Sequence, residues 1–467
     1  MCQARLFHVV LSVAAFFWAT LASTADAQPI GYEGYQVVRI TVGDDADVQK
    51  VHDLQKMLAR DFQVWSEVVK IGPVEVRVAP MARLALAASG LRYEVTIEDL
   101  QQHIDRLYSG GRGFFDSLQT YDAHVQFMND LVAAHPDLAQ MVDLGQSVQG
   151  RTMWAIRITG PGTVKPGLMY HGAEHGNEQA GASVVVYAAD YLLTNYDTDP
   201  DVAALVDNVE WYILPIMNPD GYVAYDRWNA HGVDLNRNWD GPGAGQDPWG
   251  GPYPFSEPET QNMRDFFLAH FGVRVHIDFH GYVPWIMWPW AHIPDHSPDH
   301  DQYYVLGAEY RDLVAAAGGG YYDIGTIYNV AYPVSGCSTN WVYGVEDRWS
   351  FSIETIDYDM PETCEEFLDG QLMLAEWIRS YDCNGNGVVD SEDIANQTSE
   401  DVNNNGVPDE CECPADVNSD AKVNIDDVFA VLGAWGPCDD CPEDVNADGA
   451  VDIDDISAVL DGWGPCD

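Results

Sequence analysis

The chain has 467 residues, of which 46% are hydrophobic and 12% aromatic, and its formal net charge is -52. This composition is typical of folded domains rather than disordered chains, and the length predicts two to four domains. Binding of nucleic acid through phosphate neutralisation is excluded by so acidic a chain, whereas the many carboxylates favour sites for hard cations.

The first 27 residues predict a secretory signal peptide. Arg5 and His8 precede an apolar run that ends in the small residues STADA. We therefore expect a secreted or extracytoplasmic protein, with the cell surface as one location. A membrane anchor is the alternative, disfavoured because the run is short and no basic cluster follows it. Cleavage removes Cys2 and leaves eight cysteines, an even number that suits an exported protein with disulfides.

Residues 28–112 predict a small α+β domain without cysteines. Apolar alternation predicts strands, and helical periodicity predicts helices between them. The glycine-rich segment SGGRG, 109–113, is predicted to be a joint. The expected strands cover 34–42, 74–79 and 92–97, and the expected helices cover 47–62, 81–90 and 98–108.

Residues 113–380 alternate between helical and strand patterns, starting with an amphipathic helix over 119–136. This alternation predicts an α/β domain with a mixed, mostly parallel sheet flanked by helices. Ligands of such sheets bind at the carboxyl ends of the strands. The expected strands cover 152–160, 165–173, 209–218, 273–281 and 348–355.

The stretch MYHGAEHGNEQAG, 169–181, contains two overlapping pairs with metal-ligand spacing. Residues three apart in a strand point to opposite faces, so His171 and Glu174 are expected to diverge. His175 at the strand end and Glu178 at the start of the next helix converge across a turn. We therefore favour His175 and Glu178 as the ligands.

A catalytic zinc site needs a third protein ligand and a position for water. The best candidate is His280, at the end of the apolar strand VRVHIDFHG. His276 lies about 13 Å earlier on that strand and is not expected to reach the same ion. Two histidines and one glutamate around one zinc ion form a hydrolytic arrangement.

Glu354 interrupts the apolar strand RWSFSIET. Because burial of an unpaired carboxylate is costly, we interpret Glu354 as the general base and acid, with a paired structural glutamate as the alternative. Asn236 and Arg237 in GVDLNRNWDG, with Arg227 upstream, are suited to grip a carboxylate.

As a set, these segments resemble the zinc carboxypeptidases of the carboxypeptidase A-like (funnelin, M14) family over about 31–380. The resemblance implies a zinc exopeptidase that removes C-terminal residues from peptides or proteins. HGNE and HGY resemble the zinc motif, and FSIET resembles the segment that carries the catalytic glutamate. The implied zinc ligands are His175, Glu178 and His280, and the implied catalytic residues are Glu354 and Arg227.

Two further segments resemble the substrate-binding parts of that family. NPDG followed by GVDLNRNW implies that Asn236 and Arg237 bind the substrate's C-terminal carboxylate. AYPVSGCSTNW resembles the mobile tyrosine loop, so Tyr332 would cap the substrate. The match departs from the family at Asn177, where digestive members carry arginine. It departs again at Cys337, where glycine is usual and where a disulfide would restrict the loop.

Substrate preference follows from the same resemblance. Thr339 matches the base of the specificity pocket, and Ile327, Val334 and Ser352 match other pocket positions. All four are neutral, so the resemblance implies a preference for neutral or hydrophobic C-terminal residues.

The N-terminal region resembles the activation peptide of the same family. GYEGYQVVRI and LRYEVTIEDLQQHID carry the likeness, which implies a zymogen activated by a protease that cuts at Arg106 or Arg112. A permanently attached folding module is the alternative.

Residues 381–467 change character, with 23 Asp and Glu and one Lys between 382 and 467. Four loops match the calcium pattern of oxygen ligands at fixed spacing. The last two form a repeat that resembles dockerin modules, and the second resembles a thrombospondin type 3 repeat. Symmetry suggests disulfides Cys413–Cys438, Cys441–Cys466 and Cys383–Cys411. The expected calcium ligands are Asp382, Asn384, Asn386, Asp390, Asp393, Asp401, Asn403, Asn405, Asp409, Glu412, Asp416, Asn418, Asp420, Asn424, Asp427, Asp444, Asn446, Asp448, Asp452 and Asp455.

The expected partners are peptide or protein substrates, an activating protease, and a cell-surface or scaffold partner of the C-terminal repeats. Two alternatives stay open. One is a zinc amidase of the same fold that cuts cell-wall peptides, and the other is a non-catalytic, calcium-dependent adhesive protein.

Overall fold

The computed structural model describes residues 31–381 apart from 67–68, 112, 162–164, 246 and 357–359. Beyond residue 381 it describes 390–399, 408, 415, 417, 422–437, 441, 443–446, 450–461 and 464–465. The predicted signal peptide and Arg112 lie outside the described residues, as do these predicted calcium ligands: Asp382, Asn384, Asn386, Asp401, Asn403, Asn405, Asp409, Glu412, Asp416, Asn418, Asp420 and Asp448. Within the described part, no helix combines the length and hydrophobicity that crossing a membrane requires.

The N-terminal domain is built on a four-stranded antiparallel sheet with the order β2-β3-β1-β4. Its predicted strands and helices are all present. The additional strand β2 was not predicted because three residues are too few to show alternation. The elements are β1 (Gln36–Val42), α1 (Asp45–Leu58), η1 (Ala59–Asp61), β2 (Phe62–Val64), β3 (Gly72–Val78), α2 (Ala82–Ser89), β4 (Arg92–Ile97) and α3 (Leu100–Leu107).

The central domain contains an eight-stranded sheet with the order β11-β10-β12-β9-β7-β8-β6-β5. The four inner strands β12, β9, β7 and β8 run parallel, β10 and β11 run parallel to each other, and the remaining pairings are antiparallel. The predicted mixed, mostly parallel sheet is therefore confirmed. The strands are β5 (Ala139–Gln146), β6 (Thr152–Ile158), β7 (Gly167–Gly172), β8 (Glu210–Leu214), β9 (Val273–Gly281), β10 (Trp285–Trp288), β11 (Asp323–Thr326) and β12 (Trp349–Thr355).

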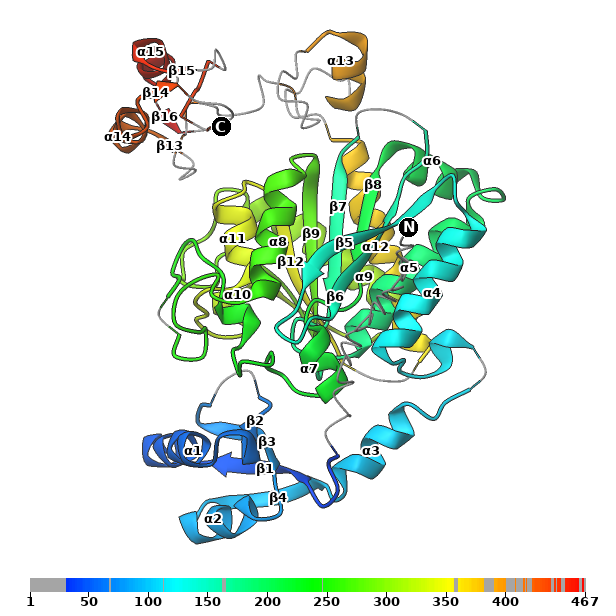
Figure 1. The fold of residues 1–467 in the computed structure, drawn as a ribbon, viewed down its shortest axis with the longest axis vertical. Helices are drawn as coiled ribbons and strands as arrows, with labels where there is room; N and C mark the ends of the chain where they lie inside the picture. The colour runs from blue at the N-terminus through cyan, green and yellow to red at the C-terminus, as the bar shows by residue number, and fades with distance from the viewer. Residues whose placement is uncertain are drawn as a thin grey trace, which may run out of the picture.

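Helices cover both faces of this sheet (Figure 1). Helices α5, α9 and α12 bury one face, and α8 and α11 bury the other. Successive side chains of each strand point to opposite faces and so contribute to both hydrophobic cores. Tyr170 and Trp211 point to the first face, while Met169 and Tyr212 point to the second. The helices are η2 (Phe114–Asp116), α4 (Tyr121–Ala134), α5 (Ala180–Asn195), α6 (Pro200–Asn208), α7 (Pro219–Ala224), η3 (Leu235–Arg237), α8 (Pro258–Ala269), α9 (His300–Ala317), α10 (Ile327–Val330), α11 (Ser338–Gly344) and α12 (Glu362–Arg379).

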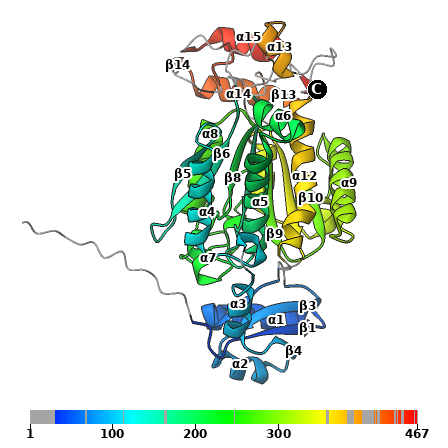
Figure 2. The same cartoon turned by 90° about the vertical axis from the view of Figure 1, so that its right-hand side faces the viewer.

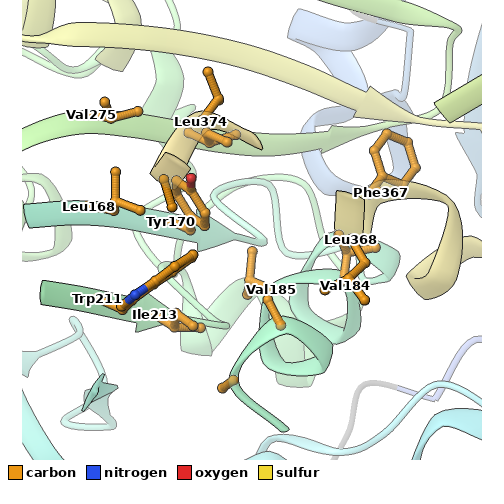
Figure 3. Close-up of a cluster of buried hydrophobic side chains, with 14 of the residues drawn as sticks. Leu168, Tyr170, Val184, Val185, Trp211, Ile213, Val275, Phe367, Leu368 and Leu374 are labelled. Atoms are coloured by element: carbon orange, nitrogen blue, oxygen red, sulfur yellow. The ribbon is translucent and has the colours of Figure 1, made fainter. Parts of the chain in front are cut away.

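Figure 3 shows how the first core is filled. Trp211, fully buried on β8, lies among side chains from β7, β9, α5 and α12. This packing fixes the inner strands against the helices that follow them, and so fixes the strand ends where the predicted site residues lie.

Among its described residues, the C-terminal segment has the equally long helices α14 (Ile425–Gly433) and α15 (Ile453–Asp461), with α13 (Asp390–Asn396) ahead of them. Its small strands pair between the two repeats, β13 (Lys422–Val423) with β16 (Gly464–Pro465) and β14 (Gly436–Pro437) with β15 (Ala450–Val451). Figures 1 and 2 place α14 and α15 at one end of the central domain and the N-terminal domain at the opposite end, beside α7.

The cysteines of the central domain do not form the disulfide considered for Cys337. Cys337 and Cys364 are both free and buried, each in a different apolar cluster, so the expectation of a disulfide at Cys337 is wrong. Burial raises the pKa of the Cys337 thiol to about 11, which disfavours the thiolate. In the C-terminal segment Cys441 is disulfide-bonded, and the predicted partner Cys466 lies outside the described residues.

Candidate active site

The structure brings His175, Glu178 and His280 together at the carboxyl ends of β7 and β9. His175 Nδ1 lies 2.9 Å from Glu178 Oε2, and His280 Nδ1 lies 3.0 Å from the same oxygen. The two Nδ1 atoms are 3.1 Å apart, and all three side chains are buried. Two imidazole nitrogens and one carboxylate oxygen facing each other at this spacing form the donor set that fits a hydrolytic zinc ion.

Two glycines permit this convergence. A Cβ on Gly172 would lie 2.5 Å from the backbone of Gly181, and a Cβ on Gly176 would lie 2.0 Å from the backbone of Gly221. Only glycine at these positions lets the turn that carries His175 pack directly on α5 and α7.

The expectation that His171 and Glu174 diverge is wrong. Strand β7 ends at Gly172, and Ala173 has a φ of 52°, so strand alternation no longer applies to Glu174. His171 Nδ1 lies 3.4 Å from Asp278 Oδ1, and Glu174 has a carboxylate oxygen within 4.8 Å of a carboxylate oxygen of Asp278 as well. Neither residue belongs to the His175 group, although Glu174 forms a second cluster of possible ligands with Asp278 and His280. The choice of the second pair stays a prediction.

The charge balance of the site favours a cation between the ligands. Burial alone would lower the pKa of His280, but Asp278 and Glu178 outweigh burial and hold that pKa well above its usual value. Burial alone would raise the pKa of Asp234, but Arg227 and His175 hold it well below its usual range. A site that stabilises positive charge in this way suits a divalent ion.

Glu354 stands opposite His280 in the parallel pairing of β12 with β9. Cross-strand partners share a face of the sheet, so its carboxylate reaches the same cleft as His280. Glu354 is 3% exposed and lines that cleft with His280.

Asn236, Arg237 and Tyr332 line the same cleft. Arg237 Nη2 donates to the Tyr332 hydroxyl at 3.0 Å, and its Nη1 donates to the Asn236 carbonyl at 2.7 Å. Arg227 lies deeper, with Nη1 3.2 Å from Glu178 Oε1 and Nε 3.0 Å from Asp234 Oδ2. The structure therefore brings the predicted catalytic residues Glu354 and Arg227 together with the proposed zinc ligands at the carboxyl ends of the inner strands.

Three of the four predicted pocket residues line the cleft and one does not. Ile327, Val334 and Ser352 line the cleft, as the resemblance implies. Thr339 is buried in α11 and is not among the described residues that line the cleft. The lining residues that were not predicted are apolar: Trp285, Met287, Ala331 and Cys337.

Sequence reasoning also missed two aspartates that hold the ligand histidines. Asp234 Oδ1 lies 3.1 Å from His175 Nε2, and Asp278 Oδ2 lies 2.8 Å from His280 Nε2. A signal for the second was present, because residues two apart on β9 share a face and Asp278 precedes His280 by two. Asp234 lies in a loop, where no periodicity reveals its direction.

The family model described as zinc carboxypeptidase matches residues 124–369, more than half of the chain. The chain is a member of the zinc carboxypeptidase family. A second model, described as carboxypeptidase activation peptide, matches residues 38–106. The protein is therefore a zinc-dependent metallocarboxypeptidase made with an activation peptide, that is, as a zymogen.

Related carboxypeptidases agree with this assignment. Carboxypeptidase A1 of Mus musculus is 27% identical over 364 residues, which cover 70% of this chain and 87% of that one. Carboxypeptidase A2 of Rattus norvegicus is 28% identical over the same length and coverage. Among solved structures, the carboxypeptidase A from Helicoverpa armigera has a TM-score of 0.61 at 24% identity and covers 74% of this chain and 99% of its own. Thrombin activatable fibrinolysis inhibitor has a TM-score of 0.65 at 19% identity, covering 74% and 98%. These two likenesses show the fold.

The activation-peptide domain of this carboxypeptidase contacts the segment that carries Arg227. Arg77 Nη2 on β3 lies 3.5 Å from Asp226 Oδ2, and Gln63 Nε2 donates to Asp226 Oδ1. Tyr32 donates its hydroxyl to the Ala224 carbonyl at 2.6 Å. With side-chain exposures of 3% and 12%, the Arg77–Asp226 pair is one in which loss of a partner leaves an uncompensated buried charge.

Arg77→Met is therefore expected to weaken docking of the activation-peptide domain by about 3 kcal/mol, or about 100-fold. The peptidase activity of the uncut chain and the rate of its cleavage by trypsin should both rise. The control is Arg39→Met, which removes an arginine whose side chain is 48% exposed and pairs with Glu75 and Glu94. Equal effects from both variants would show that Arg77 has no special part in docking.

Proposed function

We propose that this carboxypeptidase hydrolyses the C-terminal peptide bond of peptides or proteins at a zinc ion held by His175, Glu178 and His280. The observation that carries the proposal is that these three ligand atoms lie within 4.8 Å of one another and that His280 shares its cleft with Glu354. One histidine and the glutamate come from the turn after β7, and the second histidine comes from β9. No fourth His, Cys, Asp or Glu belongs to that group among the described residues, which leaves a position for water.

The remaining residues divide the work of binding and proton transfer. When bound, zinc would activate water and polarise the scissile carbonyl. Arg237 and Asn236 bind the substrate's C-terminal carboxylate, since a guanidinium and an amide match two carboxylate oxygens. Tyr332, already in contact with Arg237, covers the bound residue. Glu354 accepts the proton of the attacking water and passes it to the leaving amine. Arg227 stabilises the negative charge that develops on the carbonyl oxygen.

The preferred C-terminal residue is neutral or hydrophobic. The cleft beyond Arg237 is lined by Met287, Ile327 and Val334, and these belong to one apolar cluster with Cys337. A charged side chain would lose its hydration there without gaining a partner.

Peptides that differ only in their last residue test this preference. We expect kcat/KM for C-terminal Leu or Phe to exceed that for Lys about 100-fold, or roughly 2.7 kcal/mol, in the trypsin-treated protein. Met287→Asp should reverse the order by pairing with Lys, and Met287→Leu should preserve it. Fast release of Lys by the unsubstituted enzyme would contradict the proposed pocket.

A cell-wall amidase is the second candidate within the same fold, and the same assay separates the two. Release of single L-residues from ordinary peptides supports the carboxypeptidase. Cleavage confined to wall fragments with D-amino acids would favour the amidase. An adhesive protein without catalysis would cut neither.

We further propose that the protein is secreted after removal of residues 1–27. The activation-peptide domain would then occupy 28–112, the catalytic domain 113–380, and a calcium-binding module 381–467. The domain limits are supported by the SGGRG segment and by the change of composition after residue 381.

Calcium binding by the C-terminal module is supported by equivalent aspartates in its last two loops. Asp427 and Asp455, at the last ligand position of each loop, are both fully buried. Each accepts a backbone N–H bond of 2.7 Å, from Asn424 and Asp452 respectively. Equivalent carboxylates held inward in both repeats suit one cation in each loop.

Addition of calcium at fixed zinc concentration is expected to stabilise this module by about 2.7 kcal/mol at 100 times the dissociation constant. Thermal unfolding with and without calcium measures the shift. Asp427→Asn combined with Asp455→Asn should abolish it. Asp454→Asn, at an exposed neighbouring position, should not. No calcium-dependent shift in the unsubstituted chain would rule out the calcium loops.

The same module is proposed to bind a cell-surface or scaffold partner. Four apolar side chains of α14 and the turn after it are exposed at a spacing that gives one helix face, which is typical of an interaction surface. The C-terminal helices lie at the end of the catalytic domain away from the activation-peptide domain (Figure 2). A partner bound there would leave the cleft at the carboxyl ends of β7 and β9 accessible. The four side chains are Ile425 (50% exposed), Phe429 (61%), Leu432 (47%) and Trp435 (52%).

A further inference from the structure

His280 has two ring nitrogens, and they face different surroundings. Nδ1 points toward His175 and Glu178, at 3.1 and 3.0 Å. Nε2 lies 2.8 Å from Asp278 Oδ2 and 3.0 Å from Asn236 Nδ2. A neutral imidazole carries its proton on only one nitrogen, and the nitrogen without it is the one that binds metal. Whether Nε2 carries the proton therefore decides whether the Nδ1 lone pair can bind the metal.

The two neighbours of Nε2 favour opposite tautomers. The amide N–H of Asn236 is a donor, so it favours an Nε2 that accepts and an Nδ1 that carries the proton. That tautomer blocks the metal. The orientation of the amide is fixed, because Asn236 Oδ1 accepts from the Ser338 backbone N–H at 3.0 Å. Rotation of the amide cannot remove the conflict without breaking that bond.

Asp278 favours the other tautomer. Its carboxylate accepts only, so it needs the proton on Nε2 and leaves the Nδ1 lone pair free. A hydrogen bond to a carboxylate is roughly twice as strong as one between neutral groups, so Asp278 prevails over Asn236. The carboxylate is itself held in place, since Ser338 Oγ donates to the same oxygen at 2.7 Å and His171 Nδ1 lies 3.4 Å from the other. Asp278 is completely buried, so bulk water does not compete for its carboxylate.

We infer that Asp278 is a positioning residue that selects the zinc-binding tautomer of His280 against the competing amide of Asn236. This inference rests on the proposed assignment of His280 to the zinc. It also explains how the Asn236 amide can lie beside His280 and still bind the substrate. With Nε2 committed to Asp278, the Asn236 N–H group gains nothing from the histidine and is available to donate to a substrate carboxylate.

The test measures zinc affinity in the full chain by competition with a chelator, separately from activity. Asp278→Ala is expected to weaken zinc binding about 10- to 100-fold. Asn236→Ala alone should leave zinc binding unchanged. The double variant should recover most of the loss, because the competing donor is gone. A merely structural role for Asp278 predicts no such recovery.

Two variants complete the set. Asp278→Asn keeps the side-chain volume in case the alanine variant does not fold, and should show a smaller loss because one amide atom still accepts. Glu259→Gln removes a carboxylate that is equally buried but bonded to Val148 and Asn229 instead, and should bind zinc as the unsubstituted chain does. Nitrogen-15 NMR of the metal-free histidine rings, at a pH high enough for His280 to be neutral, should show its proton on Nε2, and on Nδ1 in Asp278→Ala.

Several results would overturn the inference. These are unchanged zinc affinity in Asp278→Ala, a double variant as weak as the single one, or an equal loss in Glu259→Gln. A second zinc ion lost on substitution of Asp278 would also do so, since Asp278 would then be a ligand. His280→Ala distinguishes this failure from failure of the proposed site. If that variant keeps full zinc affinity, the site is wrong. If His280→Ala loses zinc while Asp278→Ala does not, the proposed site stands and only the inference about Asp278 is wrong.

Discussion

Glu354→Gln is expected to lower kcat by about 10²- to 10⁴-fold while the protein still binds one zinc ion. Glutamine has nearly the same shape but accepts no proton from the attacking water and has none to give to the leaving amine. Glu354 lies opposite His280 in the sheet rather than in the ligand group, so zinc affinity should not fall. Steady-state kinetics of the trypsin-treated variant, with metal analysis of the same sample, measure both quantities.

Glu354→Asp provides the matched control. It keeps the acid but withdraws it by one methylene, so its activity should lie between those of the unsubstituted enzyme and the glutamine variant. If the glutamine variant instead turns over substrate at the normal rate, Glu354 does not transfer the proton.

Arg227→Met is expected to lower kcat by about 10²- to 10³-fold with little change in KM. Its guanidinium contacts Glu178, a proposed zinc ligand, so we expect it to act on the charge that develops beside the metal during reaction. Zinc should bind no more weakly, because the substitution removes a positive charge beside a ligand.

Arg237→Met serves as the contrast, since it should mainly raise KM by removing a contact with the substrate carboxylate. If the Arg227 variant raises KM and leaves kcat unchanged, Arg227 binds the substrate rather than stabilising the charge that develops during reaction. Loss of zinc from that variant would instead make Arg227 part of the metal site's support.

The fold was largely predictable because its long elements repeat their pattern. The nine residues of β9 and the fourteen of α1 show clear apolar periodicity, and both were anticipated. The strands β2, β10 and β11, with three or four residues each, are too short for periodicity, and their pairing depends on neighbours distant in the chain.

Site residues were predictable where the side chain lies at the end of a strand. The prediction failed where the direction of the side chain depends on the turn after the strand. His175, Glu178 and His280 follow from the rule that parallel strands present their carboxyl ends at one edge. Glu174 was misplaced because the exact end of β7 determines its direction. Asp234 was missed because its role arises only when the loop before η3 folds back to His175. Thr339 was assigned by resemblance to a pocket that apolar residues such as Met287 line instead.

The most direct test of the whole account is a crystal structure of the zinc-loaded protein with anomalous data collected at the zinc edge. We expect one peak in the catalytic domain, about 2.1 Å from Nδ1 of His175 and of His280 and bound also to Glu178, with a solvent molecule in the remaining position. A peak among Glu174 and Asp278 instead, or a fourth side chain in place of the solvent, would contradict the account.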